Sequence, residues 1–379
     1  MVFEVGRGDV RSRFRYSGSQ RRQSALKEIK LKSVTRKFLL TAALAYPWTT
    51  AAIAGEEGIT ASIPALVTEQ IAIPSDTPGI QLYIRNKHPQ GLTFPADRVL
   101  LYVHGATYPS ATAFDLRLDG MSWMDYIAAH GWDVYLVDLR GYGQSTRPPE
   151  MDQPAKDNPP IVTTNVAVRD VGAAVDYIMK RRNVSKVNLL GWSWGTSIMA
   201  AYTAANNDKV NKLALYAPLW LRNTPGLIGG DGPLGAYRSV TKENAKKRWL
   251  TGVPEEKQAE LIPAGWFDAW AAATWETDPK SKEGGLLRAP NGVIQDVREY
   301  WASGKPYYDP ANIRVPTLLV KAEWDQDTPA SMSQALFPLL KNAPAKRYVE
   351  IGEGTHTVIM EKNRLQLFHE VQLFLEEPK

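Results

Sequence analysis

Short apolar runs recur along the chain, separated by segments whose apolar residues follow helical spacing. Most of these runs are continuously apolar, which is typical of strands in a parallel sheet covered by helices on both faces. Strands are predicted at residues 99–103, 134–137, 187–190, 213–216, 317–320 and 347–351, with an opening antiparallel pair at 59–74 and 80–84. Helices are predicted at residues 122–130, 166–182, 196–205 and 362–376. The pattern therefore predicts an α/β fold with a mostly parallel central sheet and helices on both faces.

One long interruption of this alternation lies between Tyr216 and Thr317. About a hundred residues are too many for a simple connection, and these are too rich in helix formers and aromatic residues for a disordered loop. We interpret residues 217–312 as an inserted, mainly helical cap between two parts of a core, residues 55–216 and 313–379. A proline-rich segment at residues 147–160 is expected to be an irregular loop near the mouth of the pocket.

Half of the chain's twelve tryptophans lie in the predicted cap: Trp220, Trp249, Trp266, Trp270, Trp275 and Trp301. They could form the small core of the cap, which is the interpretation favoured for most of them, or the aromatic walls of a substrate pocket. The second interpretation is favoured for Trp220, which closely follows a predicted strand, and for Trp192 and Trp194. Thr107, after the strand at 99–103, is a further candidate for substrate contact.

The net charge of +5 is local to one end of the chain. Residues 1–37 hold 11 basic and 3 acidic residues, residues 38–54 hold none, and residues 55–379 therefore carry a net charge of −3. Nothing in this distribution indicates a nucleic-acid partner. The chain is 44% hydrophobic and 22% charged, so its 379 residues are sufficient for a substantial core.

The uncharged run at residues 38–54 follows the basic pair Arg36 and Lys37, as in a signal peptide. Ala52-Ile53-Ala54 has the small-x-small form of a cleavage site, and the run is shorter than the roughly 20 apolar residues of a spanning helix. We expect residues 1–54 to be a basic leader with a signal peptide near 34–54, and the protein to be secreted or periplasmic without a stable membrane span. Residues 1–33 are then either an artefact of an upstream start or an extension. The chain has no cysteine, which export permits.

The pentapeptide Gly191-Trp192-Ser193-Trp194-Gly195 joins a predicted strand to a predicted helix. A serine between two glycines at such a junction is typical of a nucleophile elbow, a strained turn that exposes the hydroxyl. The glycines are needed because strand and helix approach each other too closely for larger residues.

Two residues downstream complete a candidate catalytic set. Asp325 follows the strand at 317–320, and we prefer it as the acid over Asp327, which stands before Thr328-Pro329 and fits a turn or helix-capping role. His356 lies in a glycine-containing loop after the last predicted strand, whereas His369 and His130 fall within or at the end of helices.

From about residue 71 to the end, the sequence resembles the α/β-hydrolase superfamily. The order Ser193, Asp325, His356 is that of its catalytic triad. The segment at 101–106, Leu-Tyr-Val-His-Gly-Ala, resembles its oxyanion-loop motif, and Asp-Leu-Arg-Gly-Tyr-Gly-Gln-Ser at 138–145 resembles its turn after the following strand. The Ser193-Trp194-Gly195 arrangement at the elbow is also similar to that of prolyl-aminopeptidase-like members.

This combination predicts an acyl-enzyme mechanism. His356 would accept the proton of Ser193, and Asp325 would hold the imidazole. The backbone N–H groups of Trp194 and Ala106 are expected to form the oxyanion hole. His104 is expected to be structural, fixing the oxyanion loop. Neither a metal site nor a phosphate-binding glycine loop is indicated, and we expect no cofactor.

Hydrolysis of a carboxylic ester on a small-molecule acyl substrate is the preferred interpretation. An amidase or aminopeptidase is the alternative, and it would need acidic residues in the cap to bind a substrate ammonium group. The candidates are Glu255, Glu256, Glu260 and Glu276, although a solvated helix face explains them equally well. A non-catalytic binding scaffold is a third possibility, which an intact Ser, Asp and His set disfavours. The serine argues against dehalogenase or epoxide-hydrolase chemistry, which needs a carboxylate nucleophile.

Overall fold

A computed structural model of the chain describes residues 65–91, 93–222, 228 and 232–378. All described residues belong to one compact unit, which spans residues 61–379. The predicted leader, the signal peptide and the start of the first strand at residues 59–64 lie outside the described residues. In the described part, no helix combines the length and the apolar character needed to cross a membrane.

The central sheet has eight strands in the order β1-β2-β4-β3-β5-β6-β9-β10. Strands β1 and β2 are antiparallel to each other, β2 is antiparallel to β4, and all other neighbours are parallel. The strands are β1 (Leu66–Pro74), β2 (Gln81–Pro89), β3 (Val99–Val103), β4 (Asp133–Asp138), β5 (Val187–Trp192), β6 (Val210–Tyr216), β9 (Thr317–Ala322) and β10 (Lys346–Ile351).

The α-helices are α1 (Ser110–Phe114), α2 (Trp123–Ala129), α3 (Thr164–Arg182), α4 (Trp194–Ala205), α5 (Lys242–Trp249), α6 (Gln258–Leu261), α7 (Trp266–Glu276), α8 (Ser281–Gly284), α9 (Gly292–Asp296), α10 (Ala330–Leu336) and α11 (Arg364–Glu376). Their ends carry ordinary signals. The side chains of Ser122 and Asp125 form a capping box at α2, and Asn183 ends α3 in the left-handed conformation.

Helices cover both faces of the sheet. Successive residues of a strand point to opposite faces, so a continuously apolar strand contributes to a core on each side. In β3, Leu101 packs into a core with Val171 of α3 and Ile198 of α4. Its neighbour Leu100 packs into a second core that includes Phe368 of α11. The predicted α/β-hydrolase fold, with its mostly parallel sheet and helices on both faces, is confirmed.

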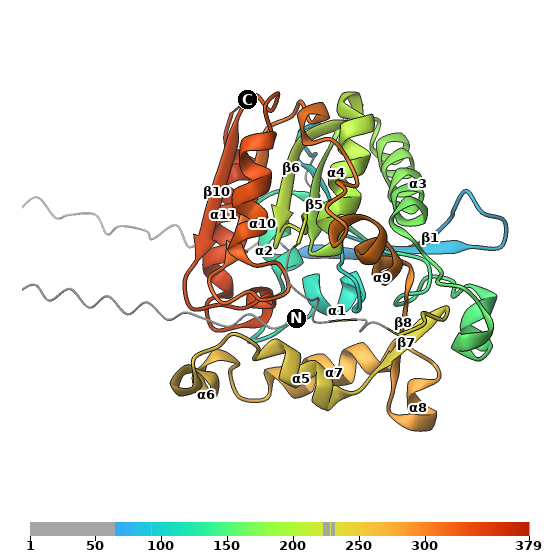
Figure 1. Cartoon of the computed structure of the whole chain (residues 1–379). Helices are drawn as coiled ribbons and strands as arrows, with labels where there is room; N and C mark the ends of the chain where they lie inside the picture. Colours follow the sequence, from blue (N-terminus) through green and yellow to red (C-terminus); the bar gives the residue numbers. More distant parts are fainter. Residues whose placement is uncertain (1–64, 92, 223–227, 229–231, 379) are drawn as a thin grey trace, which may run out of the picture. The chain divides into compact units, whose positions relative to one another are not determined.

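Between β6 and β9 the chain forms a helical layer beyond one end of the strands (Figure 1). Helices α5 to α8 make up this layer, together with a two-stranded antiparallel sheet of β7 (Tyr237–Val240) and β8 (Leu287–Pro290), which the sequence pattern did not predict. We call residues 237–290 the cap layer. The segment after it returns to the core, since Val293 and Trp301 pack into the same core as α3 and α4.

The proline-rich segment at residues 147–160 contains two short 3-10 turns, Pro149–Asp152 and Ala155–Asp157. The segment is hydrogen-bonded to the start of the cap layer. The N–H of Ala236 donates to the carbonyl of Ala155 over 2.8 Å, and the hydroxyl of Tyr237 donates to the carbonyl of Gln153 over 2.9 Å. No residue of this segment lines the two cavities described below, so the expectation that it lies at the pocket mouth is corrected.

Candidate active site

Ser193 occupies a strained turn between β5 and α4, with φ of 57° and ψ of −119°. Such a conformation is costly for a residue with a side chain and persists only when the surroundings impose it. A Cβ on Gly191 would lie 2.4 Å from the carbonyl oxygen of Gly195, and a Cβ on Gly195 would lie 2.6 Å from that of His104. Both glycines are therefore required by the close approach of strand, helix and neighbouring loop.

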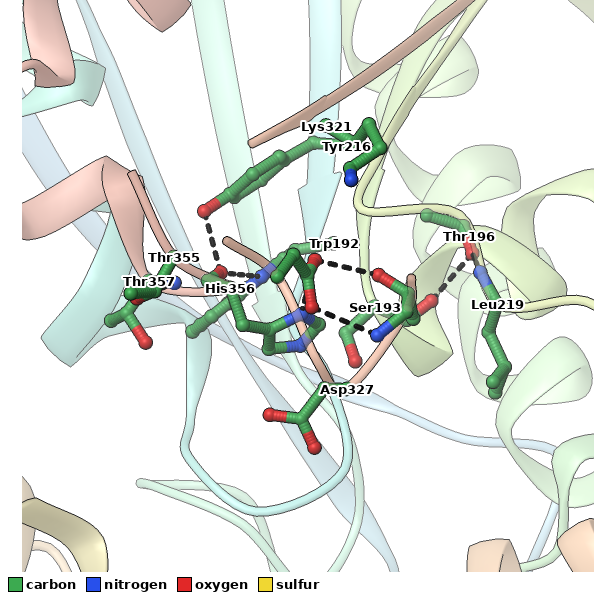
Figure 2. Close-up of polar contacts among 12 residues, drawn as sticks. Trp192, Ser193, Thr196, Tyr216, Leu219, Lys321, Asp327, Thr355, His356 and Thr357 are labelled. Carbon is green, nitrogen blue, oxygen red and sulfur yellow. Dashed lines mark hydrogen bonds and ion pairs between the residues drawn. The ribbon is translucent and has the colours of Figure 1, made fainter. Parts of the chain in front are cut away.

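Backbone hydrogen bonds hold the turn (Figure 2). The N–H of Ser193 donates to the carbonyl of Tyr216 over 2.9 Å, and the hydroxyl of Thr196 donates to the carbonyl of Ser193 over 2.5 Å. The same Thr196 oxygen accepts the N–H of Leu219 over 2.9 Å, so the turn is tied to the chain that leaves β6.

His356 lies in the loop after β10 and lines the same cavity as Ser193. Its backbone carbonyl accepts two buried donors, the indole N–H of Trp192 at 3.0 Å and the hydroxyl of Tyr216 at 2.7 Å (Figure 2). Its Nδ1 donates to Oδ2 of Asp325 over 2.9 Å. The structure thus brings the three residues predicted from the sequence to one end of the sheet.

Asp325 is 1% exposed and has all its partners close by. Besides His356, it accepts the N–H of Thr328 at 2.8 Å and the hydroxyl of that residue at 2.7 Å. These bonds fix the carboxylate that orients the imidazole, and they also complete the turn before α10. The turn-capping role that we predicted for Asp327 therefore belongs to Asp325, and α10 itself begins after Pro329 without a side-chain cap.

Asp327 instead forms an ion pair with Arg248 of α5. The Nε and Nη2 atoms of Arg248 donate to its carboxylate over 2.9 to 3.1 Å. Both residues line the cavity that contains Ser193. The pair joins the cap layer to the loop that carries Asp325.

Two opposing effects act on the pKa of His356. Burial lowers it, but the negative charges of Asp325 and Asp327 and the hydrogen bond to Asp325 outweigh burial and raise the pKa above its ordinary value of 6.5. The imidazole is therefore easier to protonate than an isolated one, as expected of a group that must stabilise a positive charge.

The loop after β3 faces the nucleophile from the other side. A Cβ on Gly105 would lie 2.9 Å from the Cβ of Ser193, so this loop is pressed against the serine. His104 donates from Nδ1 to the carbonyl of Gly105 over 2.7 Å and accepts the N–H of Leu139 at Nε2 over 3.1 Å. Burial lowers its pKa to about 4, so it remains neutral and holds the loop, in agreement with its predicted structural role.

Two adjoining cavities open at this site. The one that contains Ser193 and His356 measures about 30 Å³, room for little more than a water molecule. The second measures about 570 Å³, within the range of small-molecule sites. They share Thr107, Tyr108, Ala245 and Arg248, so the larger cavity adjoins the one that contains Ser193.

Only some of the residues predicted to contact substrate line the two cavities. Trp192 lines the small cavity, and Thr107 lines both. Ala106 also lines the small cavity, and Trp194 is the first residue of α4, directly after the nucleophile. The prediction that Trp220 contacts substrate is wrong. Its side chain is buried against Tyr308, with ring centroids 5.2 Å apart, and lines neither cavity.

The remaining cap tryptophans divide between the two interpretations. Trp249 and Trp270 pack edge to face at 5.2 Å, next to Trp275, and both also line the small cavity. They are at once the core of the cap layer and an aromatic wall. Trp301 lies in the core under α3 and α4.

No acidic pair suited to a substrate ammonium group lies in either cavity, as far as the described residues show. None of Glu255, Glu256, Glu260 and Glu276 is among the lining residues, and the one acid in the lining, Asp327, is paired with Arg248. The described residues likewise contain no cluster of three side chains able to hold a metal ion.

Glu361 is a buried residue of the site that the sequence did not reveal. It accepts the indole N–H of Trp249 at 2.7 Å, the N–H of Thr355 at 2.9 Å and the hydroxyl of Thr355. Burial raises its pKa to about 7. It ties helix α5 of the cap layer to the loop that carries His356. No sequence signal marks it, since one glutamate before a final helix is unremarkable.

Comparison with known proteins agrees with this geometry. Residues 99–363 match the family model of the alpha/beta hydrolase fold. Protein ABHD8 from Homo sapiens is 26% identical over 291 residues, covering 75% of this chain and 57% of that protein. The chain thus spans less than two thirds of the curated relatives it matches first.

Solved structures share the fold at low sequence identity. A serine hydrolase from the polyaromatic hydrocarbon-degrading bacterium Cycloclasticus zankles superposes with a TM-score of 0.56 and 13% identity, covering 82% of this chain and 98% of that one. A thermophilic esterase from Thermogutta terrifontis gives a TM-score of 0.52 and 15% identity, covering 81% and 98%.

Proposed function

The chain belongs to the α/β-hydrolase family, and from this premise we propose that it is a serine hydrolase that cleaves a carboxylic ester through an acyl-enzyme. The observation that carries the proposal is the combination of a strained serine at the elbow and a histidine that lines the same cavity and is hydrogen-bonded to a buried aspartate.

In the proposed mechanism, Ser193 Oγ attacks the ester carbonyl and transfers its proton to Nε2 of His356. Asp325 keeps the other imidazole proton on Nδ1 and stabilises the imidazolium. The proton then passes from His356 to the leaving alkoxide, which departs as an alcohol. Water then attacks the acyl-enzyme and gives a proton to the same histidine, which passes it to Ser193 Oγ as the bond to the acyl group breaks and the acid is released.

Negative charge forms on the substrate carbonyl oxygen during both steps. We assign its stabilisation to the backbone N–H groups of Trp194, at the start of α4, and Ala106, in the loop held by His104. Losing one such donor costs on the order of 3 kcal/mol in barrier height. Side-chain changes at Ala106 would then alter the shape of the hole rather than its charge.

The charge in the cavities favours an ester over the aminopeptidase alternative. An aminopeptidase must bind a substrate cation, whereas Arg238, Lys247 and Arg248 line the larger cavity. Turnover of nitrophenyl esters beside amino-acid nitroanilides tests this choice. We expect the esters to be hydrolysed and the nitroanilides not; preferential cleavage of the nitroanilides would overturn the assignment.

We also propose that the protein is exported, on the basis of the predicted signal peptide near residues 34–54. Sequencing the amino terminus of protein recovered from the native host tests this. A mature chain beginning at Gly55 is expected, and an intact leader on the active enzyme would contradict the proposal.

A further inference from the structure

The larger cavity carries an unusual balance of charge. Arg238 of β7 and Lys247 and Arg248 of α5 are among its lining residues, while none of its described lining residues is acidic. Arg248 is neutralised by Asp327 at the edge shared with the small cavity. Two positive charges are left, those of Arg238 and Lys247.

Arg238 has no carboxylate partner among the described residues. Its guanidinium donates to neutral oxygens only: the carbonyl of Ala106 at 2.5 Å, the hydroxyl of Thr107 at 2.9 Å and the carbonyl of Pro290 at 2.6 Å. Burial lowers its pKa, and the neighbouring Arg248 adds to this effect. A partly desolvated cation without a counter-ion is costly, and a bound anion would remove the cost.

Lys247 of α5 is the second cation that lines this cavity. Its side chain is exposed, and no ion pair joins it to a carboxylate in the described part of the chain. The hydroxyl of Ser239 and the amide of Asn244 also line this cavity and are able to donate hydrogen bonds. The set offers charge-assisted donors to a small oxyanion.

We propose that the larger cavity is an anion subsite, and that the natural substrate is an ester that carries a carboxylate or phosphate group on the part held under the cap layer. This inference rests on the proposed ester hydrolysis and adds the substrate class. The small cavity takes only the reacting ester group, and the body of the substrate lies past Thr107 and Tyr108, where the two cavities meet.

The test compares matched nitrophenyl esters that differ only at the far end of the acyl chain. Glutaryl, adipoyl and suberoyl esters with a free carboxylate are set against their neutral methyl esters and against chains ending in phosphate. We expect kcat/KM to be at least about tenfold higher for an anionic ester than for its neutral match, as for a hydrogen bond to a charged group. The better of the two anionic arms identifies the group. Equal or higher values for the neutral ester at every chain length would overturn the subsite.

Two variants and a control locate the effect. Lys247→Gln should lower the anionic-to-neutral ratio about threefold, a modest loss because the lysine is at the exposed rim of the site. Arg238→Gln should lower the ratio about tenfold or more. Lys242→Gln removes a positive charge from the same helix outside the cavity and should leave the ratio as it is. Equal ratios in all four proteins would contradict the proposal.

A second readout does not depend on turnover. Glutarate, adipate or suberate in solution should slow the labelling of Ser193 by a neutral fluorophosphonate, and less so in Lys247→Gln. No protection by any of the diacids or by a matched phosphate would count against the subsite. If the protein neither reacts with the fluorophosphonate nor hydrolyses any ester, the proposed function itself fails, and this outcome is distinct from hydrolysis without charge preference.

Discussion

The two sides of the active site are built in different ways. On the sheet side, hydrogen bonds to the backbone groups of Ser193 and His356 hold both residues beside a cavity with little free space. On the cap side, Trp249 and Trp270 close the small cavity, and Arg238, Lys247 and Arg248 line the much larger one beside it. In the proposed function this difference corresponds to a division of roles, in which the sheet side would fix the geometry of the reaction and the cap side would select the substrate.

Side-chain contacts from helix α5 connect the two sides. Arg248 pairs with Asp327 beside Asp325, and Trp249 donates to Glu361 behind the loop of His356. Because these residues are adjacent on α5, a movement of this helix would act on both the acid loop and the histidine loop.

Replacing Ser193 by Ala removes the nucleophile and should reduce kcat for esters by about a millionfold. The fold should be retained, since alanine is smaller and keeps the backbone N–H and carbonyl whose hydrogen bonds hold the turn. Ester turnover and a thermal melt check the two statements. Ser303→Ala, an exposed serine far along the chain, is the matched control and should behave as wild type. Retained turnover in the first variant would refute the assignment of the nucleophile.

Asp325→Asn should lower kcat by about ten thousandfold, because an amide would stabilise the wrong imidazole tautomer. Asp327→Asn leaves the hydrogen bond between Asp325 and His356 intact and should cost far less. Steady-state kinetics on the same ester compares the two variants. A larger loss in Asp327→Asn would mean that the acid has been assigned to the wrong aspartate.

The pH profile of kcat/KM reports the protonation of His356 in the free enzyme. The base must be neutral to accept a proton, so activity should rise with pH as His356 loses its proton. This rise should lie above pH 6.5, because Asp325 and Asp327 raise the pKa of His356. Asp327→Asn removes one of these negative charges and should move the acidic limb to lower pH. Asp176→Asn, an exposed residue paired with Lys209, should leave the limb in place. If the acidic limb of the pH profile stays in place in Asp327→Asn, the charge of Asp327 does not contribute to the raised pKa of His356.

Trp249→Phe removes the indole N–H while keeping an aromatic ring in the cap layer. The buried Glu361 loses one of its donors, which should lower the free energy of unfolding by about 1–3 kcal/mol. Denaturant unfolding measures this loss, and kcat should change by much less than in the variants above. Trp266→Phe is the control, because Trp266 is only partly buried and has no bond to Glu361 among the contacts of the described residues. Equal stability of both variants would show that the link to Glu361 contributes nothing.

The sheet side was predictable from the sequence because its requirements leave traces in residue type. Gly191 and Gly195 are required by contacts under 3 Å, and the buried strands hold short, largely apolar runs such as Val-Leu-Leu-Tyr-Val in β3. The cap side leaves few such traces. Strands β7 and β8 are four residues each, Tyr-Arg-Ser-Val and Leu-Arg-Ala-Pro, too short and irregular for a period of two.

Two errors have the same physical origin. Trp220 stands close after β6, but position along the chain does not determine whether a side chain turns to the pocket or to the core, and it packs against Tyr308. Asp327 was given a local capping role because its long-range partner Arg248, 79 residues away, could not be inferred from spacing. Contacts between distant segments decide both cases.

The most direct test of the central claim is covalent labelling with a fluorophosphonate, followed by mapping of the modified residue. An activated serine reacts with such a reagent, whereas an ordinary buried hydroxyl does not. The account predicts a single adduct on Ser193, which is lost in the Asp325→Asn variant at the same reagent concentration. An adduct on another residue, or labelling of Ser193 at the same rate without the carboxylate of Asp325, would contradict it.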